Sequence, residues 1–149
     1  MKHYQVRDWM TTDVFTSEPN TPMLEAHKLM RENGIRRMPV VKKGKVVGIM
    51  TRSDVRSAEP SMATTLNVWE MNYLLAQLRV RDVMTKNPFT IHPEDTIKKA
   101  AEMMHEHRIG ALPVVDAEGQ LVGIITESDV FRILINWFNA DMAASDAAF

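Results

Sequence analysis

The chain repeats itself, and this repetition limits its possible folds more than any other feature. The string Gly-Ile-x-Thr-x-Ser-Asp-Val occupies residues 48–55 and again residues 123–130. Upstream, Val-Arg-Asp-x-Met-Thr at 6–11 returns at 80–85. In this alignment roughly 23 of about 50 positions are identical, which is typical of two copies of one structural unit. We therefore expect two similar domains.

Each copy predicts the element order β-α-β-β-α. An extended piece around Phe15-Thr16, or Phe89-Thr90-Ile91, precedes a Pro-containing turn. Apolar residues at helical spacing follow, and Asn33-Gly34 ends the first helix. Two apolar runs then flank residues 42–45 or 116–119, which indicates a hairpin with Gly44 at positive φ. The fold class is therefore α+β, with two β-α-β-β-α repeats packed as one pseudo-twofold pair.

The repeats occupy residues 6–58 and 80–138. Residues 59–79 form a linker with a helix at 65–78, for which Thr64 and Thr65 are candidate caps. Its two apolar stripes predict packing on the module or on a second subunit. The small, acidic tail at 139–149 predicts a flexible end. Since halves of about 60 residues are marginal alone, we expect the repeats to share a core.

Composition excludes several classes of function. Eighteen Lys and Arg balance 19 Asp and Glu without blocks of like charge, which argues against nucleic-acid and membrane partners. The absence of cysteine excludes disulfides, thiolate catalysis and Cys-based zinc sites. No apolar signal core or membrane-length run occurs, so we expect a cytoplasmic protein. His105 and His107 lie on different helix faces, and we expect no metal site.

The repeated Thr-x-Ser-Asp segment is the main candidate for chemistry. It follows a predicted strand and begins a helix, where unpaired N–H groups and the helix dipole favour an anion. A carboxylate there can accept hydrogen bonds from ribose hydroxyls, so the combination suits a nucleotide. The alternative is a capping box, which needs the same Thr and Asp spacing. Capping alone does not explain Gly48 and Gly123 within the strands, where glycine usually marks a bulge or a close approach.

These residues resemble a known family. The doubled β-α-β-β-α unit, the Val-x-Asp-x-Met-Thr openings, Pro-Val-Val before each hairpin and Gly-Ile-x-Thr-x-Ser-Asp are similar to a pair of cystathionine-β-synthase (CBS) domains, called a Bateman module. The resemblance covers residues 6–58 and 80–138. Residues 57–64 and 69–75 are also similar to small bacterial CBS-pair proteins of the acetoin-utilisation AcuB type.

The resemblance implies a cleft between the paired domains that binds AMP, ADP, ATP or S-adenosylmethionine. The resemblance implies that the bound adenosyl compound acts as a regulatory ligand, and no catalytic cofactor is expected. Asp54 and Asp129 would hold ribose hydroxyls. Hydroxyls that would face phosphate belong to Thr51, Thr126, Ser53 and Ser128. Arg36 and Arg37 stand where some family members bind phosphate, with Gly110 and Ala111 in the second repeat. Solvated surface charge is the alternative interpretation of the two arginines.

The sequence therefore predicts a regulatory sensor that binds an adenosyl ligand and signals to a separate, unknown effector protein through a conformational or dimer change. A face-to-face homodimer of CBS modules is expected. The rival is a structural scaffold that dimerises through its CBS pair and binds no ligand. We find no set of nucleophile, base and orienting group, so we do not expect an enzyme.

Overall fold

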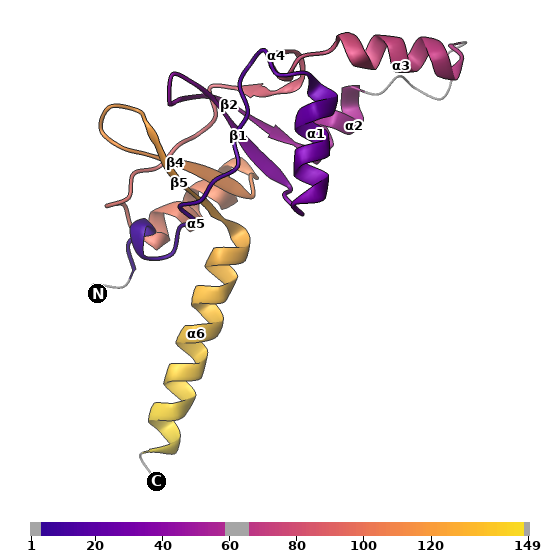
Figure 1. Ribbon diagram of the computed structural model, residues 1–149. Helices are drawn as coiled ribbons and strands as arrows, with labels where there is room; N and C mark the ends of the chain where they lie inside the picture. Colours follow the sequence, from indigo (N-terminus) through magenta and orange to yellow (C-terminus); the bar gives the residue numbers. More distant parts are fainter. Residues whose placement is uncertain (1–3, 59–65, 148–149) are drawn as a thin grey trace. The chain divides into compact units, whose positions relative to one another are not determined.

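The computed structural model describes residues 4–58 and 66–147 (Figure 1). Its contacts divide into two compact units. Unit 1 comprises Met1–Thr12, Thr90–Ala117 and Val122–Phe149, and unit 2 comprises Asp13–Phe89 and Glu118–Leu121. Both contain helices and strands, which confirms the α+β class.

Unit 2 is built on the first repeat. Helix α1 (Met23–Glu32) precedes the hairpin of β1 (Arg37–Lys42) and β2 (Lys45–Thr51), and α2 (Arg52–Ala58) follows directly. Lys43 and Gly44 both have positive φ at the hairpin turn, as predicted for Gly44. Then come α3 (Val68–Gln77), α4 (Val80–Val83) and β3 (Thr85–Lys86). Figure 1 shows α1 and α2 beside the β1–β2 hairpin.

Unit 1 carries the same arrangement in the second repeat. A 3-10 turn, η1 (Val6–Asp8), is followed much later in the chain by α5 (Ile97–His107), β4 (Ala111–Val115), β5 (Leu121–Thr126) and α6 (Glu127–Asp146). Most of the buried apolar residues of the described chain fall into two clusters. One contains Leu112 and Ile125 of unit 1, and the other contains Met38 and Met50 of unit 2. Each unit therefore has a buried cluster of its own, and the expected shared core stays a prediction.

The opening segments of the two repeats are exchanged between the units. Thr11 forms an antiparallel bridge with Ile124, and β3 pairs with β2 so that Thr85 lies opposite Ile49. The same segments bond to the turns that precede the helices: the Val6 N–H donates to the carbonyl oxygen of Asp95, and the Val80 N–H donates to the carbonyl oxygen of Thr21. Each Val-Arg-Asp-x-Met-Thr segment thus packs on the repeat to which it does not belong in sequence.

The exchange explains the two strand glycines. A Cβ on Gly48 would lie 2.5 Å from Sδ of Met84 and 3.0 Å from the carbonyl oxygen of Thr85. A Cβ on Gly123 would lie 2.7 Å from Sδ of Met10 and 2.9 Å from the carbonyl oxygen of Thr11. Another backbone therefore approaches each glycine, as one of the predicted alternatives required. These glycines no longer argue for a ligand.

The extended pieces predicted around Phe15-Thr16 and Phe89-Ile91 are single bridges rather than strands. Ser17 bridges Val40 and Ile91 bridges Val114, both in parallel. The next hydrogen bond toward the N-terminus would need an N–H from Pro39 or Pro113, and proline has none. The parallel ladder therefore does not continue toward the N-terminus.

Two predicted boundaries differ from the structure. Helix α3 begins at Val68, after the N-cap Asn67, whose side chain accepts from the Glu70 N–H at 2.9 Å. The predicted helix began at residue 65, and its proposed caps Thr64 and Thr65 lie outside the described residues. Helix α6 continues to Asp146, although no structure was predicted for residues 139–149. Alanine-rich sequence without glycine or proline favours this extension.

Candidate functional site

In unit 2, the predicted site residues gather where β2 ends and α2 begins. The Thr51 N–H donates to Oδ2 of Asp54 at 2.8 Å, and the Asp54 N–H donates to Oγ1 of Thr51 at 3.1 Å. This reciprocal pair is a capping box, as the simpler interpretation predicted. Asp54 is half-buried and Ser53 is exposed.

The two arginines lie beside that helix start. Arg37 is the β1 residue opposite Thr51, and the Arg52 N–H donates to the carbonyl oxygen of Arg36 at 3.3 Å. Five predicted residues therefore meet in unit 2, and we call them the unit 2 set: Arg36, Arg37, Thr51, Ser53 and Asp54. The exposed Arg36 side chain and the helix start provide positive charge suited to an anion.

Unit 1 brings the equivalent residues together at the start of α6. The Thr126 N–H donates to Oδ2 of Asp129 at 2.9 Å, and Oγ1 of Thr126 donates to the same oxygen at 3.2 Å. The Glu127 N–H donates to the carbonyl oxygen of Gly110 at 3.0 Å, which brings the Gly110-Ala111 segment to this helix start. The members of this unit 1 set are Gly110, Ala111, Thr126, Ser128 and Asp129.

The two sets differ in the environment of the carboxylate. Asp129 is buried, with 6% of its surface exposed, and Nη2 of Arg132 donates to its Oδ1 at 2.9 Å. The Asp54 carboxylate accepts a hydrogen bond only from the Thr51 N–H among residues 4–58 and 66–147. Sequence analysis missed Arg132, although Asp and Arg three residues apart on a helix are a known stabilising pair.

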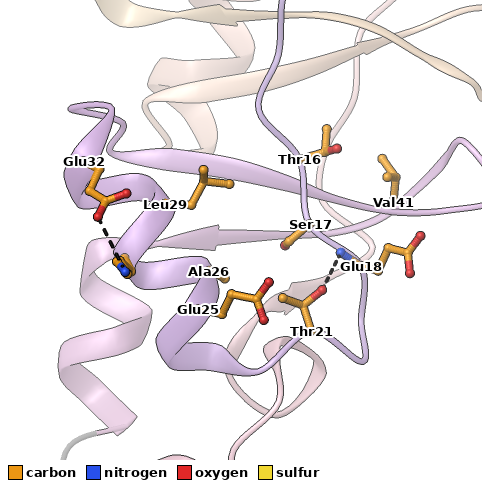
Figure 2. Close-up of a pocket in the computed structure, with 10 residues that line it drawn as sticks. Thr16, Ser17, Glu18, Thr21, Glu25, Ala26, Leu29, Glu32 and Val41 are labelled. Atoms are coloured by element: carbon orange, nitrogen blue, oxygen red, sulfur yellow. Dashed lines mark hydrogen bonds and ion pairs between the residues drawn. The ribbon is translucent and has the colours of Figure 1, made fainter.

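The structure also contains a pocket of about 500 Å³ in unit 2 that no sequence motif indicated. Figure 2 shows it between α1 and the extended residues 16–18. The pocket is bordered by four charged residues: Glu18, Glu25, Lys28 and Glu32. Nζ of Lys28 lies 3.9 Å from Oε1 of Glu32. The hydroxyl of Ser17 is buried at its wall and has no hydrogen-bond partner within the described part of the chain. None of the predicted ligand-binding residues lines this pocket.

Other chemistry in the described residues is sparse. No group of three or more His, Cys, Asp or Glu in residues 4–58 and 66–147 has the geometry to hold a metal ion. The helices of the same ranges include none long and apolar enough to span a membrane. Burial acts to raise the pKa of Asp95, but the bond from the His92 N–H and the ion pair with Lys99 outweigh it and lower that pKa.

Comparison with protein families and sequences gives a consistent result. The family model described as "CBS domain" matches residues 6–61 and 80–136. An inosine-5'-monophosphate dehydrogenase of Korarchaeum cryptofilum is 39% identical over 127 residues, which cover 85% of this chain and 24% of the dehydrogenase. The uncharacterized protein MJ1225 of Methanocaldococcus jannaschii is 34% identical over 85% of this chain and 46% of its own. The chain thus spans less than half of these relatives.

Three solved structures match this chain over nearly their whole length. A putative acetoin utilization protein (AcuB) from Vibrio cholerae has a TM-score of 0.76 and 31% identity, covering 93% of this chain and 96% of that one. CBSX2 of Arabidopsis thaliana, solved in complex with AMP, has a TM-score of 0.77 and 28% identity, covering 89% and 97%. The CBS domain pair of protein MJ0100, with 5'-methylthioadenosine and S-adenosyl-L-methionine, has a TM-score of 0.73 and 29% identity, covering 89% and 96%.

Proposed function

This chain belongs to the CBS-domain family, and from that premise we propose that it is a regulatory module that senses an adenosyl ligand. The observation that carries the proposal is the repeated helix start, where a threonine, a serine and an aspartate gather with a second segment in each unit. Support comes from CBSX2 with AMP and from the MJ0100 pair with S-adenosyl-L-methionine.

The proposed ligand engages the unit 1 set, the unit 2 set or both. Asp54 and Asp129 accept ribose hydroxyls, while Thr51, Thr126 and the helix N–H groups face the phosphate or an equivalent group. Arg36 and Arg37 favour an anionic ligand because a guanidinium binds phosphate through a planar fork of donors. These roles make the ligand regulatory, and no reaction is assigned to the chain.

Signalling requires a partner, since ligand shifts an equilibrium only by binding one state better than another. We propose a homodimer and a separate effector protein as the elements that respond. Exposed apolar side chains support both: Trp69 on α3 is 83% exposed, and α6 exposes Phe131, Ile135, Phe138 and Met142. Light scattering of the purified protein with and without AMP measures whether a dimer forms and whether ligand alters it.

Thermal-shift titration of the full chain against AMP, ADP, ATP and S-adenosylmethionine tests the ligand. At a hundredfold excess over Kd, one site adds about 2.7 kcal/mol of stability. For a domain of this size the corresponding shift in Tm is about 5–10 °C. Asp54→Asn and Asp129→Asn remove one charge each while leaving a residue that caps a helix well. The readout is the ligand-induced increment in Tm, and a smaller increment in one variant identifies the set that binds.

The second candidate is an interaction scaffold without ligand. One observation favours it: the Thr51 and Asp54 groups bond to each other, and the strand glycines are explained by backbone packing. In that case no adenosyl compound shifts the Tm of the parent protein, and the dimer is unchanged by AMP. The same titration therefore separates the two candidates.

A further inference from the structure

The carboxylates of Asp54 and Asp129 differ in how many hydrogen bonds their oxygens already accept, and so in how readily a ligand can bind to them. Asp129 uses Oδ2 for two bonds from Thr126, and the Arg132 guanidinium occupies its Oδ1 at 2.9 Å. The Asp54 carboxylate receives one bond, from the Thr51 N–H to Oδ2, and no other from the described residues. A ribose hydroxyl would thus meet an occupied carboxylate in unit 1 and a more open one in unit 2.

The repeats differ at the position of Arg132. In the alignment that superposes Asp54 on Asp129, the residue equivalent to Arg132 is Ser57. The basic residues are distributed in the opposite way before the hairpins, where Arg36 and Arg37 correspond to Gly110 and Ala111. Each set therefore has arginine nearby, but only in unit 1 does the structure join an arginine to the repeated aspartate.

We propose that Arg132 determines which ligands the unit 1 set accepts. The inference rests on the proposed adenosyl site. A ribose hydroxyl binds Oδ1 of Asp129 only by displacing the guanidinium, which costs the ion pair. An anionic group on the same ligand offsets part of this loss. The displaced guanidinium lies within the first turns of α6 and can bind an anion at the helix start. The set therefore selects AMP over uncharged adenosine.

The exposure of the two partners makes this exchange feasible. The Asp129 side chain is 9% exposed and stays in place, whereas the Arg132 side chain is 60% exposed and can turn into solvent. A pair with one exposed partner contributes about as much as a surface salt bridge, which corresponds to roughly a two- to fivefold change in affinity. Arg132 is thus a specificity-determining residue that ligand can move, rather than a fixed part of the core.

Isothermal titration calorimetry of the full chain with adenosine and with AMP tests the proposal. The Asp54→Asn background isolates the unit 1 set, and Arg132→Ser introduces the residue of the other repeat. The variant should bind adenosine about two- to fivefold more tightly, because the hydroxyl no longer competes. Its AMP affinity should change little, since the gain at Asp129 is offset by the lost cation, so the preference for AMP falls by a similar factor.

Two further variants provide matched controls. Arg132→Lys keeps the charge without the planar fork and should retain an AMP preference intermediate between parent and Arg132→Ser. Ser57→Arg, in an Asp129→Asn background, installs the pair in unit 2 and should weaken adenosine binding there by about two- to fivefold. A purely structural ion pair would lower the Tm of Arg132→Ser without altering the ratio of the two affinities.

Each outcome decides the matter. An unchanged ratio in Arg132→Ser, with the parent still binding, overturns the role of Arg132 and leaves the proposed function intact. Binding by the parent that disappears in every Asp54→Asn protein also overturns it, since the unit 1 set then binds nothing. Adenosine binding by Arg132→Ser alone supports it in its strongest form. If neither adenosine nor AMP binds to the parent or to any variant, the proposed function and the inference are both rejected.

Discussion

The two helix starts share the string Gly-Ile-x-Thr-x-Ser-Asp-Val and yet hold their aspartates differently. In unit 2, Asp54 is half-buried at the start of a seven-residue helix. In unit 1, Asp129 is buried within the first turn of a 20-residue helix and is held by Arg132. The backbone bond to threonine is the same in both. Identical strings therefore produce the same local cap, while residues outside the string decide how accessible the carboxylate is.

Both units place a strand glycine, Gly48 or Gly123, against another backbone segment. Replacing these glycines should change the free energy of unfolding more than any other substitution discussed below. Gly123→Ala and Gly48→Ala should each lower the free energy of unfolding by about 2–3 kcal/mol, because the new Cβ meets a backbone oxygen as well as a methionine. Urea unfolding measures the loss. In Gly123→Ala, adding Met10→Ala should restore only part of it, since the Thr11 carbonyl remains. Two variants as stable as the parent would contradict the exchange of opening segments.

Replacing either aspartate with alanine should lower the free energy of unfolding by less than the glycine substitutions do, and the loss should differ between the two units. Asp129→Ala should cost about 2 kcal/mol, because it removes a cap and leaves Arg132 without its buried partner. Asp54→Ala should cost about 1 kcal/mol, the usual value of a cap. The two losses are compared by urea unfolding in the absence of ligand. Equal losses would mean that burial and Arg132 add nothing to the shared capping interaction.

The turns before α1 and α5 should differ in their response to acid. Asp95 accepts from the His92 N–H at 2.9 Å, whereas the equivalent residue Thr21 accepts from the Glu18 N–H at 3.2 Å through a hydroxyl. Asp95→Asn should cost about 1 kcal/mol at pH 7. Because the folded pKa of Asp95 is lowered, its stabilisation is present above the unfolded value of about 4 and is lost as pH falls through the folded value.

Urea unfolding of parent and Asp95→Asn at pH 7 and at pH 3 measures this dependence. The difference between the two proteins should shrink at the lower pH, because the stabilisation from a carboxylate with a lowered pKa begins to be lost below the unfolded value. Thr21→Ala is the control, because a hydroxyl does not titrate in this range and its cost should be the same at both pH values. A difference for Asp95→Asn that stays constant from pH 7 to pH 3 would contradict the assigned ion pair and hydrogen bond.

The helix ends before β1 and β4 should give the smallest effect, and it is a gain. Gly34 and Arg108 occupy equivalent positions, and both have positive φ, of 62° and 52°. Arginine is disfavoured there because its Cβ crowds the backbone. Arg108→Gly should therefore raise the free energy of unfolding by about 0.5–1 kcal/mol, and Gly34→Arg should lower it by a similar amount. Thermal unfolding of both variants measures the two changes in stability. Changes of the same sign would refute the assignment of a positive φ to both positions.

Several elements could be predicted because their causes are local. Asn33-Gly34 ends α1 as expected, with the Ile35 N–H bonded to the Met30 carbonyl. Gly44 forms the hairpin turn, and Thr51 with Asp54 forms the cap. The start of α3 was missed because Asn67 and Glu70 form a capping box that competes with the upstream threonines. The extent of α6 was missed because a weak apolar pattern does not prevent alanine-rich sequence from continuing a helix.

The sequence by itself determined the repeat, the CBS family, the order of elements and the residues at each helix start, since all of these follow from local pattern and spacing. Only the tertiary structure decided that each opening segment packs on the opposite repeat, that Gly48 and Gly123 are required by that packing, and that Arg132 holds Asp129. The physical reason is that two equivalent strands offer the same hydrogen bonds to either opening segment. Local sequence therefore specifies the contact but not its partner, which depends on how the chain connects the repeats.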